Sequence, residues 1–161
     1  MKNENVRKVI MGADPNGMTL KNFIRDHLRE EGYDVTDVDP EEPVLYQDAA
    51  KAVATAVQSG VYDRGIALCG TGMGVSIICN KHRGIYAALC ESVYQARRSK
   101  TINNTNVLCM GGFIIGNVMG LEMANAWLEA EHLKGISSKE AEACGKEFNE
   151  LVEFEKSVYS K

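Results

Sequence analysis

Hydrophobic residues follow two alternating patterns over the first two thirds of the chain: short apolar runs, and apolar positions at helical spacing. The short runs predict five strands, over residues 7–12, 33–38, 63–68, 85–90 and 106–110. The helical spacing, seen at Leu20, Ile24 and Leu28, predicts helices over residues 18–31, 46–59, about 73–80 and 91–101. Such alternation is typical of a parallel sheet with helices on both faces. The sequence therefore predicts a doubly wound, Rossmann-like α/β fold with five parallel strands in three layers.

The last third of the chain is predicted to be helical. Apolar positions at Leu121, Trp127 and Leu128 indicate a helix over residues 118–132. Ser137-Ser138-Lys139-Glu140 is typical of a capping box, which would open a last helix over about 137–157. Apolar and acidic residues both occur along that helix. This pattern is compatible with packing on its own domain or on a neighbouring subunit. With 161 residues and 45% hydrophobic content, we expect a single domain spanning residues 1–161.

A glycine-rich stretch, Cys69-Gly70-Thr71-Gly72-Met73-Gly74, directly follows the third predicted strand. Glycines at alternate positions let backbone N–H groups converge on an anion, and the start of the following helix favours negative charge. Cys69 stands at the mouth of this loop, where the same field would favour a thiolate. Asp14 follows the first strand. Because ligands bind at the carboxyl ends of the strands in such sheets, we expect Asp14 and Cys69 to share one site.

Charge and composition exclude several classes of function. The net charge of −4 and pI near 5.4 argue against nucleic acid as a partner. No apolar run reaches the roughly 20 residues of a membrane span, and the N-terminus lacks the apolar core of a signal peptide, so we expect no membrane partner. Five cysteines without a CxxC or Cys/His cluster indicate reduced thiols in a cytoplasmic protein and no metal site.

Three stretches occur in the same order as in a known family. GADPNGMTLK follows the first strand, CGTGMGVSIICNK follows the third, and NNTNVLCMGG runs into the fifth. Over roughly residues 7–135, the chain resembles the sugar-phosphate isomerases that include ribose-5-phosphate isomerase type B and galactose-6-phosphate isomerase. The resemblance implies aldose–ketose isomerisation of a small phosphorylated sugar (tetrose, pentose or hexose phosphate), without a metal or other cofactor. It also implies dimers or tetramers with active sites at subunit interfaces.

Aldose–ketose isomerisation needs a base that moves a proton between C1 and C2, and donors for the enediolate oxygen. With the resemblance, Cys69 is the candidate base, the amides of residues 70–74 are the candidate anion hole, and the Thr71 hydroxyl is a helper. Matching residues of the family bind the sugar. The candidate substrate-binding residues are therefore Asp14, Tyr46, Gly70, Gly72, Met73, Gly74 and Asn103.

The chain departs from the family at five positions. Pro15 replaces a histidine, Ile102 replaces the histidine that acts as the ring-opening acid, and Phe113 replaces an arginine. Ile136 and Glu140 align with two arginines that hold the phosphate. One chain of the two-chain galactose-6-phosphate isomerase keeps the cysteine and lacks these partner-side features. We therefore hypothesise that a paralogous chain completes this site, with a homodimer or tetramer as the alternative.

Other interpretations of the same residues stay open. Cys69 could be a small core residue, Asp14 a turn or helix-capping residue, and Tyr46 a packing residue. Asn103 could simply satisfy a turn. A non-catalytic sugar-phosphate-binding or regulatory subunit is the main alternative function. A cysteine-dependent phosphatase is disfavoured because Val75 stands where its arginine would be. A dinucleotide-binding domain would carry GxGxxG after the first strand instead.

Overall fold

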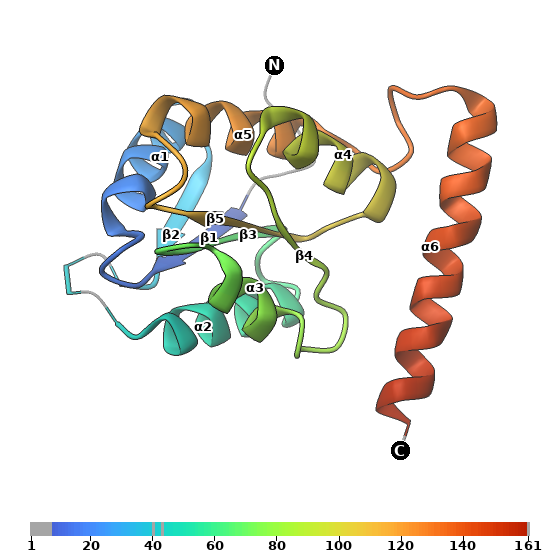
Figure 1. Ribbon diagram of the computed structural model, residues 1–161, viewed down its shortest axis with the longest axis horizontal. Coiled ribbons are helices and arrows are strands. Elements are labelled where there is room, and N and C mark those ends of the chain that lie inside the picture. The colour runs from blue at the N-terminus through green and yellow to red at the C-terminus, as the bar shows by residue number, and fades with distance from the viewer. Residues whose placement is uncertain (1–7, 40, 43, 161) are drawn as a thin grey trace.

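The computed structural model describes residues 8–39, 41–42 and 44–160, and its strands form one parallel sheet (Figure 1). Arg7, the first residue of the first expected strand, lies outside the described residues. The strand order across the sheet is β2-β1-β3-β5-β4. The strands are β1 (Lys8–Ala13), β2 (Asp34–Asp37), β3 (Arg64–Cys69), β4 (Ala87–Leu89) and β5 (Val107–Gly111). The helices are α1 (Met18–Glu30), α2 (Tyr46–Gln58), α3 (Met73–Cys79), α4 (Val93–Asn103), α5 (Asn117–Glu129) and α6 (Ser138–Tyr159).

Helices cover both faces of this sheet, which confirms the expected three-layer α/β/α fold (Figure 1). Helices α1, α4 and α5 lie on one face, where Trp127, Leu108 and Met11 belong to one buried cluster. Helices α2 and α3 lie on the other face, where Val53 and Val107 belong to a second cluster. Burying each such side chain contributes about 1.5–3 kcal/mol. The central strands are covered on both faces, which is why they are continuous apolar runs.

The register of the central strands brings three loops to one edge of the sheet. Ala13 pairs with Leu68, and Cys69 pairs with Gly111. The loops that follow β1, β3 and β5 therefore leave the sheet side by side, at its carboxyl edge. Helices α4 and α5 run back toward the amino edge, where α4 ends at Asn103. The carboxyl edge holds the candidate base and the amino edge holds Asn103.

Strand β4 is shorter than the apolar run predicts, Ala87–Leu89 instead of 85–90. Asparagine side chains take the place of ladder bonds at its start. The Asn106 carboxamide accepts the Tyr86 N–H at 2.8 Å, and the Asn80 carboxamide accepts the Ala87 N–H at 2.9 Å. Because these donors are already satisfied, the backbone needs no further strand pairing there.

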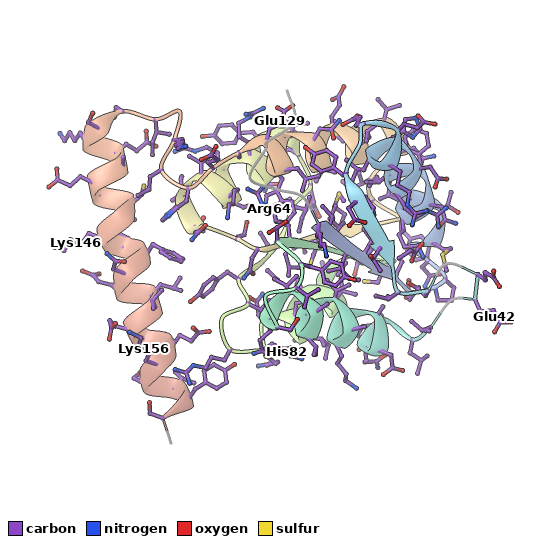
Figure 2. All side chains as sticks on the ribbon, turned by 180° about the vertical axis from the view of Figure 1, so that it is seen from behind. Glu42, Arg64, His82, Glu129, Lys146 and Lys156 are labelled. Carbon is purple, nitrogen blue, oxygen red and sulfur yellow. The ribbon has the colours of Figure 1, made fainter. Side chains whose placement is uncertain are left out.

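Helix α5 ends at Glu129, three residues before the predicted end at His132. Arg64 causes this early end, since its guanidinium donates to the carbonyl oxygens of Trp127 and Ala130, the latter at 2.7 Å. These carbonyls are thereby satisfied without another helical turn. Arg64 lies inside the body of the fold in Figure 2, although it is charged, because β3 begins under α5. Burial lowers the pKa of Arg64 to about 10.

Helix α6 stands beside α4 and the β4 edge of the domain (Figure 1). The Ser137 hydroxyl accepts the Glu140 N–H, which confirms the predicted start of this helix. The Glu155 carboxylate accepts bonds from the Gly84 N–H at 2.7 Å and the Tyr86 hydroxyl at 2.9 Å. Leu151, Phe154 and Val158 nevertheless stay exposed along the helix. Among the described residues, no helix, α6 included, is both long and apolar enough to cross a membrane.

Candidate active site at the carboxyl edge

Three loops are hydrogen-bonded together around Cys69. The Gly112 N–H donates to the Cys69 carbonyl at 2.8 Å, and the Phe113 N–H donates to the Gly70 carbonyl at 2.9 Å. The Asp14 N–H donates to the Leu68 carbonyl at 3.2 Å. The segments after β1, β3 and β5 are thus joined into one surface. We call the loop 69–74 with its flanking contacts the Cys69 cradle.

Two glycines are sterically required for this assembly. Gly72 has φ of +77°, and a Cβ there would lie 2.5 Å from Leu89 Cδ1. A Cβ on Gly112 would lie 2.2 Å from the Asn16 carbonyl oxygen. Distances below 3.0 Å force neighbouring atoms to move, and the φ of Gly72 is unfavourable for any L side chain. The alternation of glycines therefore serves close backbone packing as well as access to the amides.

The cradle places backbone donors beside the Cys69 thiol. The Gly72 N–H points at Cys69 Sγ, with a distance of 3.1 Å between nitrogen and sulfur. The Thr71 hydroxyl accepts the Met73 N–H at 3.4 Å. Within the described ranges, the N–H groups of Thr71 and Gly74 donate to no protein acceptor. Unpaired donors next to a thiol are what an oxyanion site requires.

Two aromatic rings flank the glycine loop. A Cβ on Gly74 would lie 2.7 Å from a ring carbon of Tyr46, so the ring packs directly on that backbone. A Cβ on Gly70 would lie 2.7 Å from a ring carbon of Phe113. The structure thus brings Tyr46 to the cradle, as expected. Sequence reasoning identified Phe113 only as the replacement for an arginine; no local pattern indicated that it forms a wall of the cradle.

The Asp14 side chain stabilises the turn between β1 and α1. Its Oδ1 accepts the N–H groups of Asn16 at 2.9 Å and Gly17 at 3.0 Å, and the residue is buried. These bonds shape the turn that starts α1. Its side-chain hydrogen bonds to the described part of the chain involve Oδ1 alone, so Oδ2 is the oxygen that a ligand could reach.

Asn103 does not join the cradle. It is the exposed last residue of α4, four residues before β5, whereas Cys69 pairs with Gly111 at the end of β5. A strand rises about 3.3 Å per residue, so the length of β5 separates the two residues by roughly 15 Å. Within one chain, Asn103 cannot contact a sugar held at Cys69. The turn role belongs to Asn104, which has φ of 51° and caps α4.

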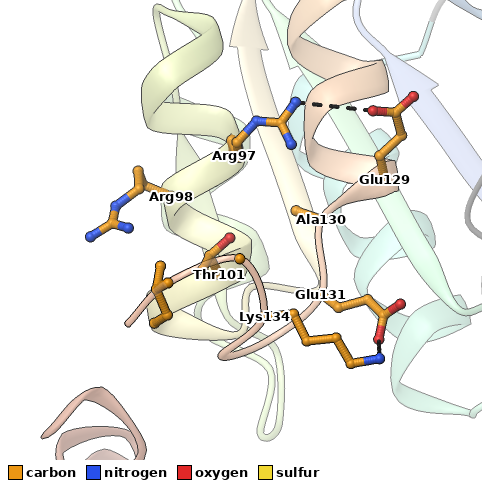
Figure 3. A pocket seen from close by; sticks show the side chains of 9 residues that line it. Arg97, Arg98, Thr101, Glu129, Ala130, Glu131 and Lys134 are labelled. Carbon is orange, nitrogen blue, oxygen red and sulfur yellow. Dashed lines mark ion pairs between the residues drawn. The ribbon is translucent and has the colours of Figure 1, made fainter. Parts of the chain in front are cut away.

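A cavity of about 250 Å³ lies at the amino edge, between α4 and the segment that follows α5 (Figure 3). Figure 3 shows Arg97 reaching toward Glu129, at 4.0 Å, and Lys134 toward Glu131, at 2.5 Å. We call this cavity the ion-pair pocket. Its lining includes Arg97, Arg98, Thr101, Glu129, Glu131, Lys134 and Ile136.

Two of the other four cysteines, Cys90 and Cys109, have thiols with raised pKa values. All five thiols are free and buried. Burial raises the pKa of Cys90 to about 11. The Cys79 hydrogen bond and burial together raise the pKa of Cys109 well above its usual value. The thiols of Cys90 and Cys109 therefore stay protonated near neutral pH. No group of three or more His, Cys, Asp or Glu side chains within the described ranges is arranged to hold a metal ion.

Comparison with protein families gives one match over most of the chain. The model of the ribose/galactose isomerase family matches residues 9–143. Several relatives are similar over more than four fifths of the chain. The 4-deoxy-4-sulfo-D-erythrose isomerase of Clostridium sp. (strain MSTE9) is 39% identical over 157 residues, which are 96% of this chain and 99% of the relative. The D-erythrulose-4-phosphate isomerase of Pectobacterium atrosepticum is 42% identical over 140 residues, 85% of this chain and 92% of the relative.

A solved structure is similar over nearly the same range. Ribose-5-phosphate isomerase B of Clostridium thermocellum superposes with a TM-score of 0.84 at 38% sequence identity. The superposition covers 94% of this chain and 99% of that chain.

Proposed function

The chain belongs to the ribose/galactose isomerase family, a family of sugar-phosphate isomerases, and from this premise we propose that it interconverts the aldose and ketose forms of a small anionic sugar with Cys69 as the base. The observation that carries the proposal is the position of Cys69 Sγ beside the amides of the cradle. A thiol at a strand end and a set of unpaired N–H groups are the two parts that enediolate chemistry needs.

The proposed reaction is a balanced proton transfer. The Cys69 thiolate takes the proton from C2 of the open-chain aldose, and the released electron pair forms a double bond between C1 and C2. The negative charge moves to the C1 oxygen, where the N–H groups of Thr71 and Gly74 stabilise it. The Cys69 thiol then returns its proton to C1. The C2 hydroxyl becomes a carbonyl as its proton passes to the C1 oxygen, with the Thr71 hydroxyl as relay. The product is the ketose, and no external oxidant or reductant is used.

We propose a four-carbon sugar substituted at C4. The names of the two relatives both specify such a sugar, one with a sulfo group and one with a phosphate. A four-carbon aldose closes a five-membered ring only through its C4 hydroxyl, so substitution at C4 keeps the sugar open. An open sugar needs no ring-opening acid. Ile102, an apolar residue where the resemblance leads one to expect that acid, is compatible with such a substrate.

We further propose that a second copy of the chain completes the site. Exposed apolar residues surround the cradle, among them Met73, Phe113, Ile114 and Val118. Asn103 and the ion-pair pocket lie at the opposite edge of the same chain. A neighbouring copy that presented its amino edge would cover the apolar rim and add polar groups to the cradle. A paralogous chain in that place is the alternative outcome of the tests below.

Mixing two inactive variants tests the shared site. Cys69→Ala damages the cradle of a copy, and Asn103→Ala damages the opposite edge. If each site uses one edge from each copy, variants unfolded together and refolded at equal amounts should recover about a quarter of wild-type activity, because half of the dimers are mixed and each has one intact site. The measurement is the rate of aldose–ketose conversion by NMR. Recovery no greater than that of the separate variants contradicts a shared site.

Turnover by the purified chain separates the remaining alternatives. Isomerisation by the chain alone supports the homo-oligomer, while turnover only after addition of a paralogous family chain supports the two-chain enzyme. Binding of the sugar without turnover in both preparations supports the non-catalytic subunit and overturns the proposed reaction.

Helix α6 gives a prediction about assembly. Phe154 is 70% exposed and lies on the stripe with Leu151 and Val158. An aromatic side chain at an interface buries 150–250 Å². Phe154→Glu is therefore expected to shift the protein toward monomer, by at least tenfold in the dissociation constant measured by sedimentation. Lys146→Glu, on the same helix but off the stripe, should leave association unchanged. Equal effects of both variants would mean that net charge, and not the stripe, governs assembly.

A further inference from the structure

The ring of Phe113 is an apolar surface that lies against one end of the Cys69 cradle. A Cβ on Gly70 would lie 2.7 and 2.9 Å from two carbons of this ring, so the ring rests directly on the Gly70 backbone. The Phe113 N–H also donates to the Gly70 carbonyl at 2.9 Å. The side chain is nevertheless 69% exposed. A ligand at this end of the cradle therefore meets an aromatic surface.

The backbone that carries Phe113 is anchored on both sides. Before it, the Gly112 N–H donates to the Cys69 carbonyl at 2.8 Å. After it, the Ile115 N–H donates to the Gly111 carbonyl at 2.9 Å. Moving the ring away from the cradle would break these bonds or remove its contact with the glycine loop. The ring thus forms a fixed wall.

The proposed reaction sets the direction in which a sugar lies along the cradle. The C1 oxygen belongs near the N–H groups of Thr71 and Gly74, at the end of the loop where α3 begins. The turn between β1 and α1 approaches the other end of the loop, where Asn16 Cβ would lie 3.5 Å from a Cβ on Gly70. With C1 beside α3, the carbons beyond C2 run toward this turn and toward the Phe113 ring.

An apolar wall at that end limits the length of the sugar. A four-carbon sugar places only C3 and the substituted C4 beyond the two reacting carbons. A five-carbon sugar adds one CHOH group, and its hydroxyl would lose water against a ring that offers no strong hydrogen-bond partner. One carbon group too many in a fitted pocket changes kcat/KM about 10–200-fold.

We propose that Phe113 is a specificity-determining residue, whose ring excludes sugars longer than four carbons from the cradle. The inference rests on the proposed isomerase function, because that function sets the direction of the bound sugar. Phe113 also belongs to the apolar rim that a neighbouring copy would cover, so the test must separate a change in the site from a change in assembly.

The test compares two ketoses that differ by one CHOH group, D-erythrulose 4-phosphate and D-ribulose 5-phosphate. Neither has a free hydroxyl that could close a five-membered ring, so both are open and need no ring-opening acid. Both carry the same phosphate, so its charge cancels in the ratio. We expect kcat/KM to be at least tenfold higher for the four-carbon ketose. If the chain converts only sulfonates, 4-deoxy-4-sulfo-D-erythrulose and 5-deoxy-5-sulfo-D-ribulose replace this pair.

Variants of the ring test its role in the same assay. Phe113→Ala should move the ratio of the two kcat/KM values at least tenfold toward the five-carbon sugar. Phe113→Leu, which keeps a smaller apolar side chain, should move the ratio in the same direction by less, and it replaces the alanine variant if that variant does not fold. Ile114→Ala, at the neighbouring exposed position of the same rim, should leave the ratio within about twofold. Circular dichroism and sedimentation establish that the variants fold and assemble alike.

The outcomes separate the two proposals. Turnover of no four-carbon sugar, with or without a paralogous chain, overturns the isomerase function. Turnover with an equal or higher kcat/KM for the five-carbon sugar leaves the isomerase function in place and overturns the length limit. A preference for four carbons that both Phe113 variants leave unchanged, or that Ile114→Ala alters as much, also overturns the role of the ring.

Discussion

Replacing Cys69 by alanine is expected to lower kcat about 10²–10⁴-fold, which is the contribution of a positioned general base. The substitution removes the thiol but leaves the backbone donors of Thr71 and Gly74 in place. KM should therefore change by less than about threefold, because the sugar keeps its binding contacts. The melting temperature should fall by about 2–4 °C, as expected for loss of a small buried side chain. Steady-state kinetics with the four-carbon substrate, together with a melting curve, measure these effects.

Cys90→Ala is the matched control for this variant. Cys90 is also buried near the end of a strand, but burial raises its pKa to about 11, so it is no base at neutral pH. Its alanine variant should show a similar loss of stability and retain kcat within about twofold. If Cys69→Ala also kept more than about a tenth of the wild-type kcat, Cys69 would be a small core residue and not the base.

Replacing Lys21 by methionine is expected to lower the free energy of unfolding by about 3–5 kcal/mol. Lys21 is completely buried, and its Nζ lies 2.7 Å from Asp37 Oδ1 and 3.4 Å from Asp39 Oδ1. Asp39 in turn accepts the Ala13 N–H at the end of β1. Methionine fills most of the space but leaves the buried carboxylate of Asp39 without its cation. Asp37 keeps Arg25, whose Nη1 lies 2.7 Å from Asp37 Oδ2. Urea denaturation at pH 8 measures the loss.

The loss from Lys21→Met should be smaller at pH 5 than at pH 8. Burial already raises the pKa of Asp39 to about 6, and removal of the cation raises it further. A raised folded-state pKa means that the folded protein takes up a proton as pH falls, so protonation relieves the unpaired charge below about pH 6. Lys51→Met, at an exposed lysine that is 3.5 Å from Asp48, should cost no more than about 0.5 kcal/mol at either pH. An equal loss at both pH values would mean that packing, and not the carboxylates, causes it.

Local sequence pattern was sufficient to predict the elements and the location of the cradle. The apolar runs and helical stripes predicted every strand and helix to within a few residues, because their periodicity reflects which side chains must be buried. The order of strands and helices implied a parallel sheet, and in such a sheet the carboxyl ends of the strands meet at one edge. That rule was enough to place Asp14 beside Cys69, where the structure has them. The roles of Asp14 in sugar binding and of Cys69 as the base stay predictions.

Element ends were harder to predict because partners far along the chain decide them. Arg64 terminates α5 from a position 66 residues before Ala130, and asparagine side chains shorten β4. Lys21 shows the same limit. A lysine in an amphipathic helix is normally placed on the solvent-exposed face. Lys21 is nevertheless buried, because it pairs with the carboxylates of Asp37 and Asp39. A pattern of apolar positions contains no information on such pairs.

The sequence by itself determined that this chain has a doubly wound fold and a cysteine beside a cluster of backbone donors. Only the tertiary structure decided which residues face one another. In the folded chain, Asn103 lies at the opposite edge of the sheet from Cys69, and Phe113 packs against the cradle. Arg98 pairs with Glu140, which is 42 residues further along the sequence. The physical reason is that burial and backbone geometry are local properties of the chain, whereas ion pairs and shared surfaces form only once distant segments are packed together.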